Sequence, residues 1–181
     1  MVAPSLPSPP NPRPPVEPAG GALPRPEPRL RLLVTEDRVH ADEHWTRQMP
    51  RLLGPLGVEA ARVPSGTAAL DAASRMRFDI AVIDLATPAG GSGPLRPPAS
   101  GLWLLEVLRR MEGAPATVVI NAAAGPRQAE RLLLASLRLG ASAVIPRPVE
   151  LNTLLEAIRR VLRRGHQDRW PGDAATRPPA A

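Results

Sequence analysis

The stretch FDIAVIDLATP, residues 78–88, decides the fold, because here a short apolar run ends in a carboxylate. Residues 80–83 are apolar and uninterrupted, which is typical of a strand that is buried on both faces of a parallel sheet. Asp84 follows this run directly, and Pro88 ends the pattern. Open α/β sheets place their chemistry at the carboxyl ends of such strands, so Asp84 is a candidate functional residue.

A second acidic position has the same character. The segment LRLLVTED, residues 30–37, is another apolar run, and it ends in Glu36 and Asp37. Three carboxylates at two strand ends predict a site for a hard cation and a phosphoryl group, because carboxylate oxygens are preferred ligands of such cations. The same three residues can also be interpreted as caps of the helices that follow them.

The composition narrows the chemistry and the compartment. The chain has 181 residues and no cysteine, which excludes disulfides, thiolate nucleophiles and cysteine-ligated metals. No stretch approaches the roughly 20 apolar residues that a membrane-spanning helix needs. The amino terminus lacks the basic start and apolar core of a signal peptide. We therefore expect a soluble cytoplasmic protein. The net charge of +6 permits acidic partners without establishing them.

Strand and helix patterns alternate between two tails. Residues 1–28 are rich in proline and poor in bulky apolar side chains, so we expect a disordered tail there and a second one at 165–181. A single domain is expected over residues 29–164. Its expected strands are 30–35, 58–63, 79–84, 116–121 and 142–146, and its expected helices are 39–53, 66–76, 101–112, 126–138 and 150–164. This order predicts an α/β fold, with helices on both faces of a parallel sheet.

Several segments, taken in order, resemble one family. They are LLVTED (32–37), FDIAVIDLATP (78–88), SGLWLLEVLRRM (100–111) and LGASAVIPRP (139–148). Together they resemble the response-regulator receiver domain, the CheY-like family, over about residues 29–164. The resemblance implies a flavodoxin-like (βα)5 fold, a doubly wound parallel sheet of strand order 2-1-3-4-5.

The resemblance also implies roles for the acidic residues. By position, Asp84 would accept a phosphoryl group from a histidine kinase or a phosphotransfer protein. Glu36, Asp37 and Asp84 would hold Mg²⁺ together with the backbone carbonyl of Ala86, a set of hard oxygen ligands that suits this ion. The cation would neutralise phosphoryl charge while the protein positions the reacting groups. Such a protein is a signalling receiver and at most catalyses its own phosphoryl transfer and dephosphorylation.

Three positions depart from the family pattern. Asn121 replaces the Thr or Ser at the end of the fourth strand, although its amide is still a hydrogen-bond donor. Arg147 replaces the lysine before Pro148, where the resemblance implies a cis bond, and its planar fork differs from a compact ammonium. Val144 stands at the aromatic switch position. Two interpretations follow: a receiver with altered phosphorylation, or a pseudo-receiver that works without it.

The remaining expectations concern the loop after Asp84 and the partners. Residues 89–99 lengthen this loop, either as a lid over the site or as a tolerated surface insertion. No output domain is recognisable after residue 164, so we expect a stand-alone receiver that signals by protein–protein contact. The resemblance places the contact surface at about residues 126–164, for a downstream protein or for a second copy of the chain.

Two further motifs have competing interpretations. The sequence HADEH, residues 40–44, matches an inverted zincin pattern, but no third zinc ligand is evident from the sequence. Arginine pairs at 159–160 and 163–164 can contact phosphates of a nucleic acid, or they can form a solvated helix end that suits the helix dipole. A nucleic-acid-binding protein is therefore a less favoured alternative.

Overall fold

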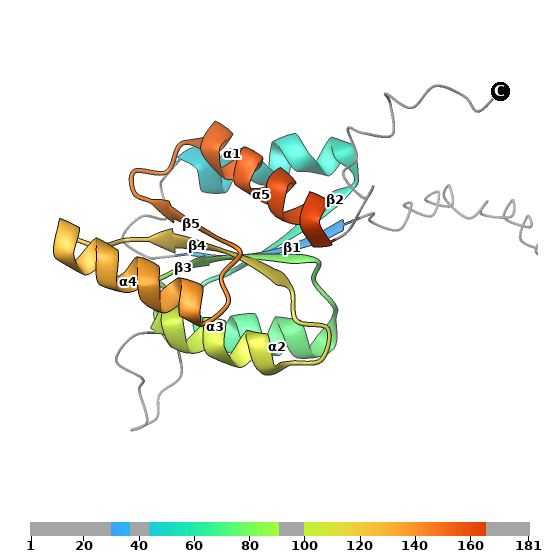
Figure 1. The fold of residues 1–181 in the computed structure, drawn as a ribbon. Helices are drawn as coiled ribbons and strands as arrows, with labels where there is room; N and C mark the ends of the chain where they lie inside the picture. Colours follow the sequence, from blue (N-terminus) through green and yellow to red (C-terminus); the bar gives the residue numbers. More distant parts are fainter. Residues whose placement is uncertain (1–29, 37–43, 91–99, 166–181) are drawn as a thin grey trace, which may run out of the picture.

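A computed structural model describes residues 30–36, 44–90 and 100–165 (Figure 1). Its five parallel strands form one sheet of order β2-β1-β3-β4-β5, which confirms the predicted fold class and strand order. The elements are β1 (Leu30–Thr35), α1 (His44–Leu53), the 3₁₀ turn η1 (Gly54–Leu56), β2 (Val58–Val63), α2 (Gly66–Arg75), β3 (Ile80–Asp84), α3 (Ser100–Arg110), β4 (Ala116–Asn121), α4 (Pro126–Arg138), β5 (Ala143–Pro146) and α5 (Leu151–Gly165).

The burial of the strands follows their place in the sheet. All five residues of the central strand β3 are buried, as its uninterrupted apolar run predicts. The edge strand β2 instead has one buried residue, Val58, and exposes or half-exposes the others. The predicted strand limits agree with the observed ones to within one residue. Helix α1 contains Pro50 and continues beyond it to Leu53, the predicted last residue of this helix.

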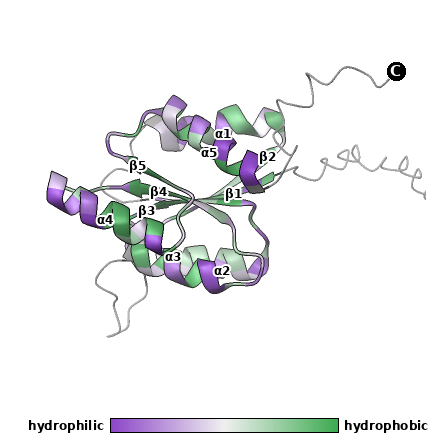
Figure 2. Ribbon diagram, in the orientation of Figure 1, coloured by the Kyte–Doolittle hydropathy of each residue, from purple (hydrophilic) through white to green (hydrophobic). Residues whose placement is uncertain are grey.

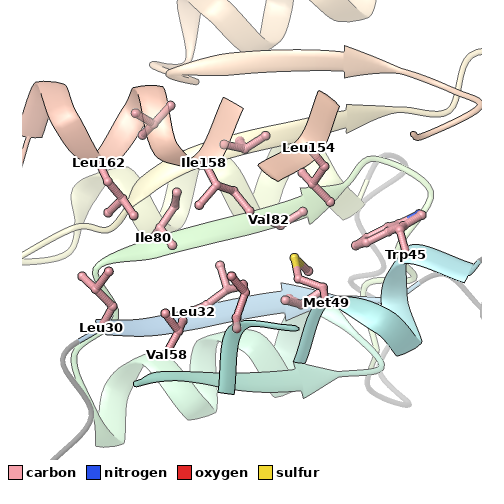
Figure 3. Packing of buried hydrophobic residues seen from close by; sticks show 14 of the residues in the cluster. Leu30, Leu32, Trp45, Met49, Val58, Ile80, Val82, Leu154, Ile158 and Leu162 are labelled. Carbon is pink, nitrogen blue, oxygen red and sulfur yellow. The ribbon is translucent and has the colours of Figure 1, made fainter. Parts of the chain in front are cut away.

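Helices cover both faces of the sheet. Helices α1 and α5 lie on one face, and α2, α3 and α4 lie on the other (Figure 1). On the first face, Met49 of α1 and Leu154 and Ile158 of α5 pack against strand residues such as Ile80 and Val82 (Figure 3). On the second face, leucines of α3 pack against the other side of the same strands. Each apolar face of the sheet is therefore buried, which supplies most of the stability of this fold.

Helix α4 differs from the other helices. Its only buried residue is Ser136. Three of its leucines, Leu133, Leu134 and Leu137, are exposed, and part of α4 is coloured as apolar in the hydropathy view (Figure 2). The helix thus contributes little to the core and presents apolar side chains to its surroundings.

Two glycines in the connections have the conformation that the sequence indicates. Gly57 and Gly140 have φ values of 80° and 91°, the left-handed conformation expected after a helix or helical turn. None of the described helices has the length and apolar character to cross a membrane. The tails expected at 1–28 and 165–181 lie outside the described residues, apart from Gly165, which is the last residue of α5.

Candidate functional site at the carboxyl ends of the strands

Asp84 ends β3 and is almost completely buried, with 1% of its surface exposed. Its Oδ1 accepts a hydrogen bond of 2.8 Å from the backbone N–H of Ala86. Its Oδ2 accepts a hydrogen bond from the guanidinium of Arg147, with which it forms an ion pair. A buried carboxylate is costly unless it is paired and hydrogen-bonded, and this one has both kinds of partner.

Arg147 follows β5 and joins two of the predicted site residues. Its guanidinium bonds Asp84, and its backbone N–H donates to the carbonyl of Asn121 at 3.2 Å. Its side chain is only 12% exposed. The Arg147–Pro148 bond is cis, as the resemblance implied. The structure therefore brings Asp84, Asn121 and Arg147 together at the carboxyl ends of the strands, as the resemblance implied.

Two threonines hold the backbone around Asp84, and the sequence interpretation missed both. The N–H of Asp84 donates to Oγ1 of Thr35 at 2.9 Å, and Oγ1 of Thr87 donates to the same oxygen at 2.8 Å. Both threonines are buried. Thr35 ends β1 and Thr87 lies three residues after Asp84, so these bonds tie the phosphoacceptor candidate to a neighbouring strand. The available signal for Thr35 was a polar residue directly after an apolar run.

Glu36 also pairs with an arginine, but on another strand. The Nε of Arg62, in β2, donates to Oε1 of Glu36. The side chain of Glu36 is 20% exposed, and that of Arg62 is 37% exposed. Arg62 lies on the edge strand β2, in register with Val34 of β1. The ion pair of Glu36 and Arg62 therefore lies toward the β2 edge of the sheet. No sequence pattern indicated this partner, which lies 26 residues further along the chain on another strand.

The described carboxylates suit Mg²⁺ in chemistry, although each of them is already paired. Glu36 and Asp84 provide hard oxygens at the ends of β1 and β3, as the predicted cation site requires. Asp37, the third predicted ligand, lies outside the described residues. Within the described ranges no group of three or more acidic, histidine or cysteine side chains is close enough to hold a metal. A cation here would therefore share Glu36 and Asp84 with Arg62 and Arg147.

Asn121 ends β4 and uses its amide toward helix α4. Its Nδ2 donates to the carbonyl of Ala129 at 2.9 Å, and its Oδ1 accepts from the N–H of Ala123 at 3.2 Å. Asn121 is buried. The sequence predicted an amide donor near a phosphoryl group, whereas here both polar atoms of the amide bond α4 and the loop before it.

The loop after Asp84 begins against helix α2. The carbonyls of Pro88 and Ala89 accept from the N–H groups of Gly66 and Thr67 at 2.9 Å and 2.8 Å, so they satisfy donors that the start of a helix leaves unpaired. Ala89 is buried, so the loop is anchored where it leaves the site. The rest of the predicted insertion, residues 91–99, lies outside the described residues.

The other sequence motifs have simpler outcomes. Val144 is half-buried and packs against the second core cluster, as an aliphatic residue without a swinging ring should. His40 and Glu43 of the HADEH motif lie outside the described residues, and His44 begins α1. Arg159, Arg160, Arg163 and Arg164 lie on α5, where the last two occupy the final turn and suit the helix dipole.

Comparison with known proteins agrees with this geometry. No family model matches the chain. It is 32% identical to the transcriptional activator protein PfeR of Pseudomonas aeruginosa over 81% of this chain and 41% of that protein. It is 31% identical to the sensory transduction protein RegX3 of Mycobacterium bovis over 76% of this chain and 52% of that protein. The chain therefore spans about half the length, or less, of the curated relatives it matches.

A solved structure shows the same fold. A CheY-like response regulator receiver domain protein from Methanospirillum hungatei superposes with a TM-score of 0.56 at 22% identity, covering 75% of this chain and 94% of that one. Receiver domains in general depend on Mg²⁺ and act in signalling, not as ordinary enzymes. The strand order and these matches together show that the described part of the chain has the fold of CheY-like response-regulator receiver domains, which it resembles also in the buried aspartate at the end of β3.

Proposed function

We propose that Asp84 accepts a phosphoryl group from a histidine kinase or a phosphotransfer protein, and that the domain passes this signal on by protein–protein contact. The single observation that carries the proposal is the environment of Asp84. It is a buried carboxylate at the end of the central strand, and it bonds both a backbone N–H and a guanidinium. The resemblance to response-regulator receiver domains supports the same role.

The residues of the chain have separable tasks in this proposal. An oxygen of Asp84 attacks phosphorus while the bond from phosphorus to the donor nitrogen breaks. Arg147 provides positive charge for the phosphoryl oxygens, and the N–H of Ala86 orients the carboxylate. Mg²⁺, when bound, would be held by Glu36, Asp37, Asp84 and the carbonyl of Ala86, and it would neutralise phosphoryl charge.

The contact surface in this proposal is the face formed by residues 126–164, from α4 through β5 to α5. The exposed leucines of α4 support this assignment, because exposed apolar side chains that gather on one helix often mark a protein contact. A downstream protein and a second copy of the chain are both candidate partners. We place this activity in the cytoplasm, where histidine kinases present their phosphoryl groups.

The test is the intact mass of the full chain after incubation with Mg²⁺ and acetyl phosphate. The proposal predicts the gain of one phosphoryl group by the wild-type protein and none by Asp84→Asn, an isosteric variant that lacks the nucleophilic carboxylate. Asp79→Asn is the matched control, because Asp79 lies on the same segment before β3. It should still gain the group. Equal labelling of the wild type and Asp84→Asn would sink the assignment.

A second candidate is a pseudo-receiver whose contacts do not depend on phosphorylation. The observation in its favour is that Asp84 and Asn121 are already engaged, with Arg147 and with α4, in the unphosphorylated protein. This candidate predicts no mass gain, from acetyl phosphate or from a kinase, in a protein that circular dichroism shows to be folded. It also predicts that Asp84→Asn keeps the partner binding of the wild type.

A further inference from the structure

The junction between β4 and α4 is held by two amide side chains. Asn121 bonds forward to the N–H of Ala123 and to the carbonyl of Ala129, in the first turns of α4. Gln128, also in the first turn, bonds back to the N–H of Ala124 at 3.3 Å. The helix has Gly125 as its N-cap, which offers no side-chain cap. These three hydrogen bonds, here called the amide clamp, therefore hold the start of the helix in place.

The position of helix α4 depends on the amide clamp more strongly than it would in a helix with a larger buried apolar face. Ser136 is the only residue of α4 that is buried, whereas α3 buries three leucines against the sheet. A helix with little buried apolar surface is held weakly by packing. The hydrogen bonds at its start therefore contribute a larger share of the free energy that keeps it in place. The exposed residues Leu133, Leu134 and Leu137 lie one to two turns after the clamp.

The amide clamp and the ion pair of Asp84 and Arg147 contact different parts of the domain. The side chain of Asn121 bonds α4 and the loop before it, whereas the side chain of Asp84 bonds Ala86 and Arg147 among its partners. A backbone hydrogen bond from the N–H of Arg147 to the carbonyl of Asn121 joins the two parts. An uncharged amide whose oxygen and nitrogen are both bonded has little differential interaction with added phosphoryl charge, and only a differential interaction shifts an equilibrium.

We propose that Asn121, with Gln128, is a positioning residue that holds α4 in one place whether or not Asp84 is phosphorylated. The leucine face of α4 (Leu133, Leu134 and Leu137) is then presented permanently, and the signal of Asp84 reaches the contact surface through its other elements, β5 and α5. The inference rests on the proposed function only in taking Asp84 as the residue that is modified. The clamp itself is testable without any phosphodonor.

The first arm measures hydrogen–deuterium exchange of the full chain without a phosphodonor. Asn121→Ala should speed exchange within α4 about tenfold, the effect of losing roughly one net hydrogen bond, with α2 and α3 unchanged. Gln128→Ala should give a smaller effect in the same segment. Arg127→Ala, an exposed neighbour outside the clamp, is the matched control and should have none. Unchanged exchange in α4, or an equal rise in every helix, would overturn the inference.

The second arm repeats the measurement with Mg²⁺ and acetyl phosphate, with the extent of labelling read from the intact mass. In the wild type, exchange within α4 should stay the same after phosphorylation. In Asn121→Thr, which removes the amide and supplies a hydroxyl, exchange within α4 should become dependent on the phosphodonor. A merely structural role for Asn121 would not produce that dependence. A severalfold change within α4 of the phosphorylated wild type would contradict the inference.

The two arms separate the two proposals. If the wild type gains no phosphoryl group, the proposed function fails while the first arm still decides the clamp. If Asn121→Ala does not fold, Gln128→Ala serves in its place, because Gln128 is exposed and its truncation leaves the core intact. Normal exchange of α4 in that variant would then count against the clamp.

Discussion

Two carboxylate–arginine pairs stand at neighbouring strand ends of this domain, and they differ mainly in burial. In the pair of Asp84 and Arg147 the side chains are 1% and 12% exposed. In the pair of Glu36 and Arg62 they are 20% and 37% exposed. The chemistry is the same, but water can replace a lost partner only in the second pair. The inner pair should therefore control the stability of the site, and the outer pair should contribute little.

The surroundings sharpen this difference. Asp84 also accepts from Ala86, and its backbone is tied to β1 through Thr35 and Thr87. Glu36 is joined to β2 by the ion pair and by its backbone N–H, which donates to Val63 at 3.0 Å. The phosphoacceptor candidate is thus preorganised from several sides, as a reacting group should be.

The largest effect is expected from Arg147→Gln. The substitution removes the guanidinium that pairs with the buried carboxylate of Asp84, which should lower the free energy of unfolding by about 3–5 kcal/mol. Urea denaturation followed by circular dichroism measures this. Asp84→Asn in the same background removes the stranded charge and should recover a large part of the loss. If Arg147→Gln alone unfolds within about 1 kcal/mol of the wild type, burial does not determine how much this ion pair contributes to stability.

Thr35→Val should have the next largest effect. It keeps the shape of the side chain but removes the acceptor for the N–H of Asp84 and for the hydroxyl of Thr87. Each buried donor without a partner costs about 1–3 kcal/mol, so the loss of the acceptor for two donors should cost at least about 2 kcal/mol. The matched control is Thr67→Val, because the hydroxyl of Thr67 is exposed. Equal stability of Thr35→Val and wild type would mean that this network does not hold Asp84.

The smallest effect is expected from Arg62→Gln. Exposed ion pairs contribute about 0–1 kcal/mol and are screened by salt, so this variant should unfold close to the wild-type denaturant midpoint. Raising the salt concentration should remove any remaining difference. A loss as large as that of Arg147→Gln would contradict the contrast between the two pairs.

The sequence predicted the backbone of this fold well, because its signals are local. The apolar run before Asp84 indicated a central strand, and the three- and four-residue spacing of leucines in α5 indicated a helix, as observed. The end of an apolar run indicated Asp84, and the resemblance to receiver domains indicated Asn121 and Arg147; the register of the parallel strands brings these chain segments to the same side of the sheet.

The partners of the side chains could not be predicted in the same way. Glu36 meets Arg62 because of the β1–β2 register, and the amide of Asn121 turns to α4 because of the path of the loop between them. Both depend on packing between segments that are distant along the chain or joined by irregular backbone. Asp37, which the cation proposal also needs, lies outside the described residues, so its role stays a prediction.

The most direct test of the central claim locates the phosphoryl group. After incubation with Mg²⁺ and acetyl phosphate, the full chain is reduced with borohydride, which converts an aspartyl phosphate to homoserine, and is then digested and sequenced by tandem mass spectrometry. The account predicts homoserine at position 84 and an unchanged aspartate at Asp79. Labelling at Asp79, or at any other carboxylate in place of Asp84, would contradict it.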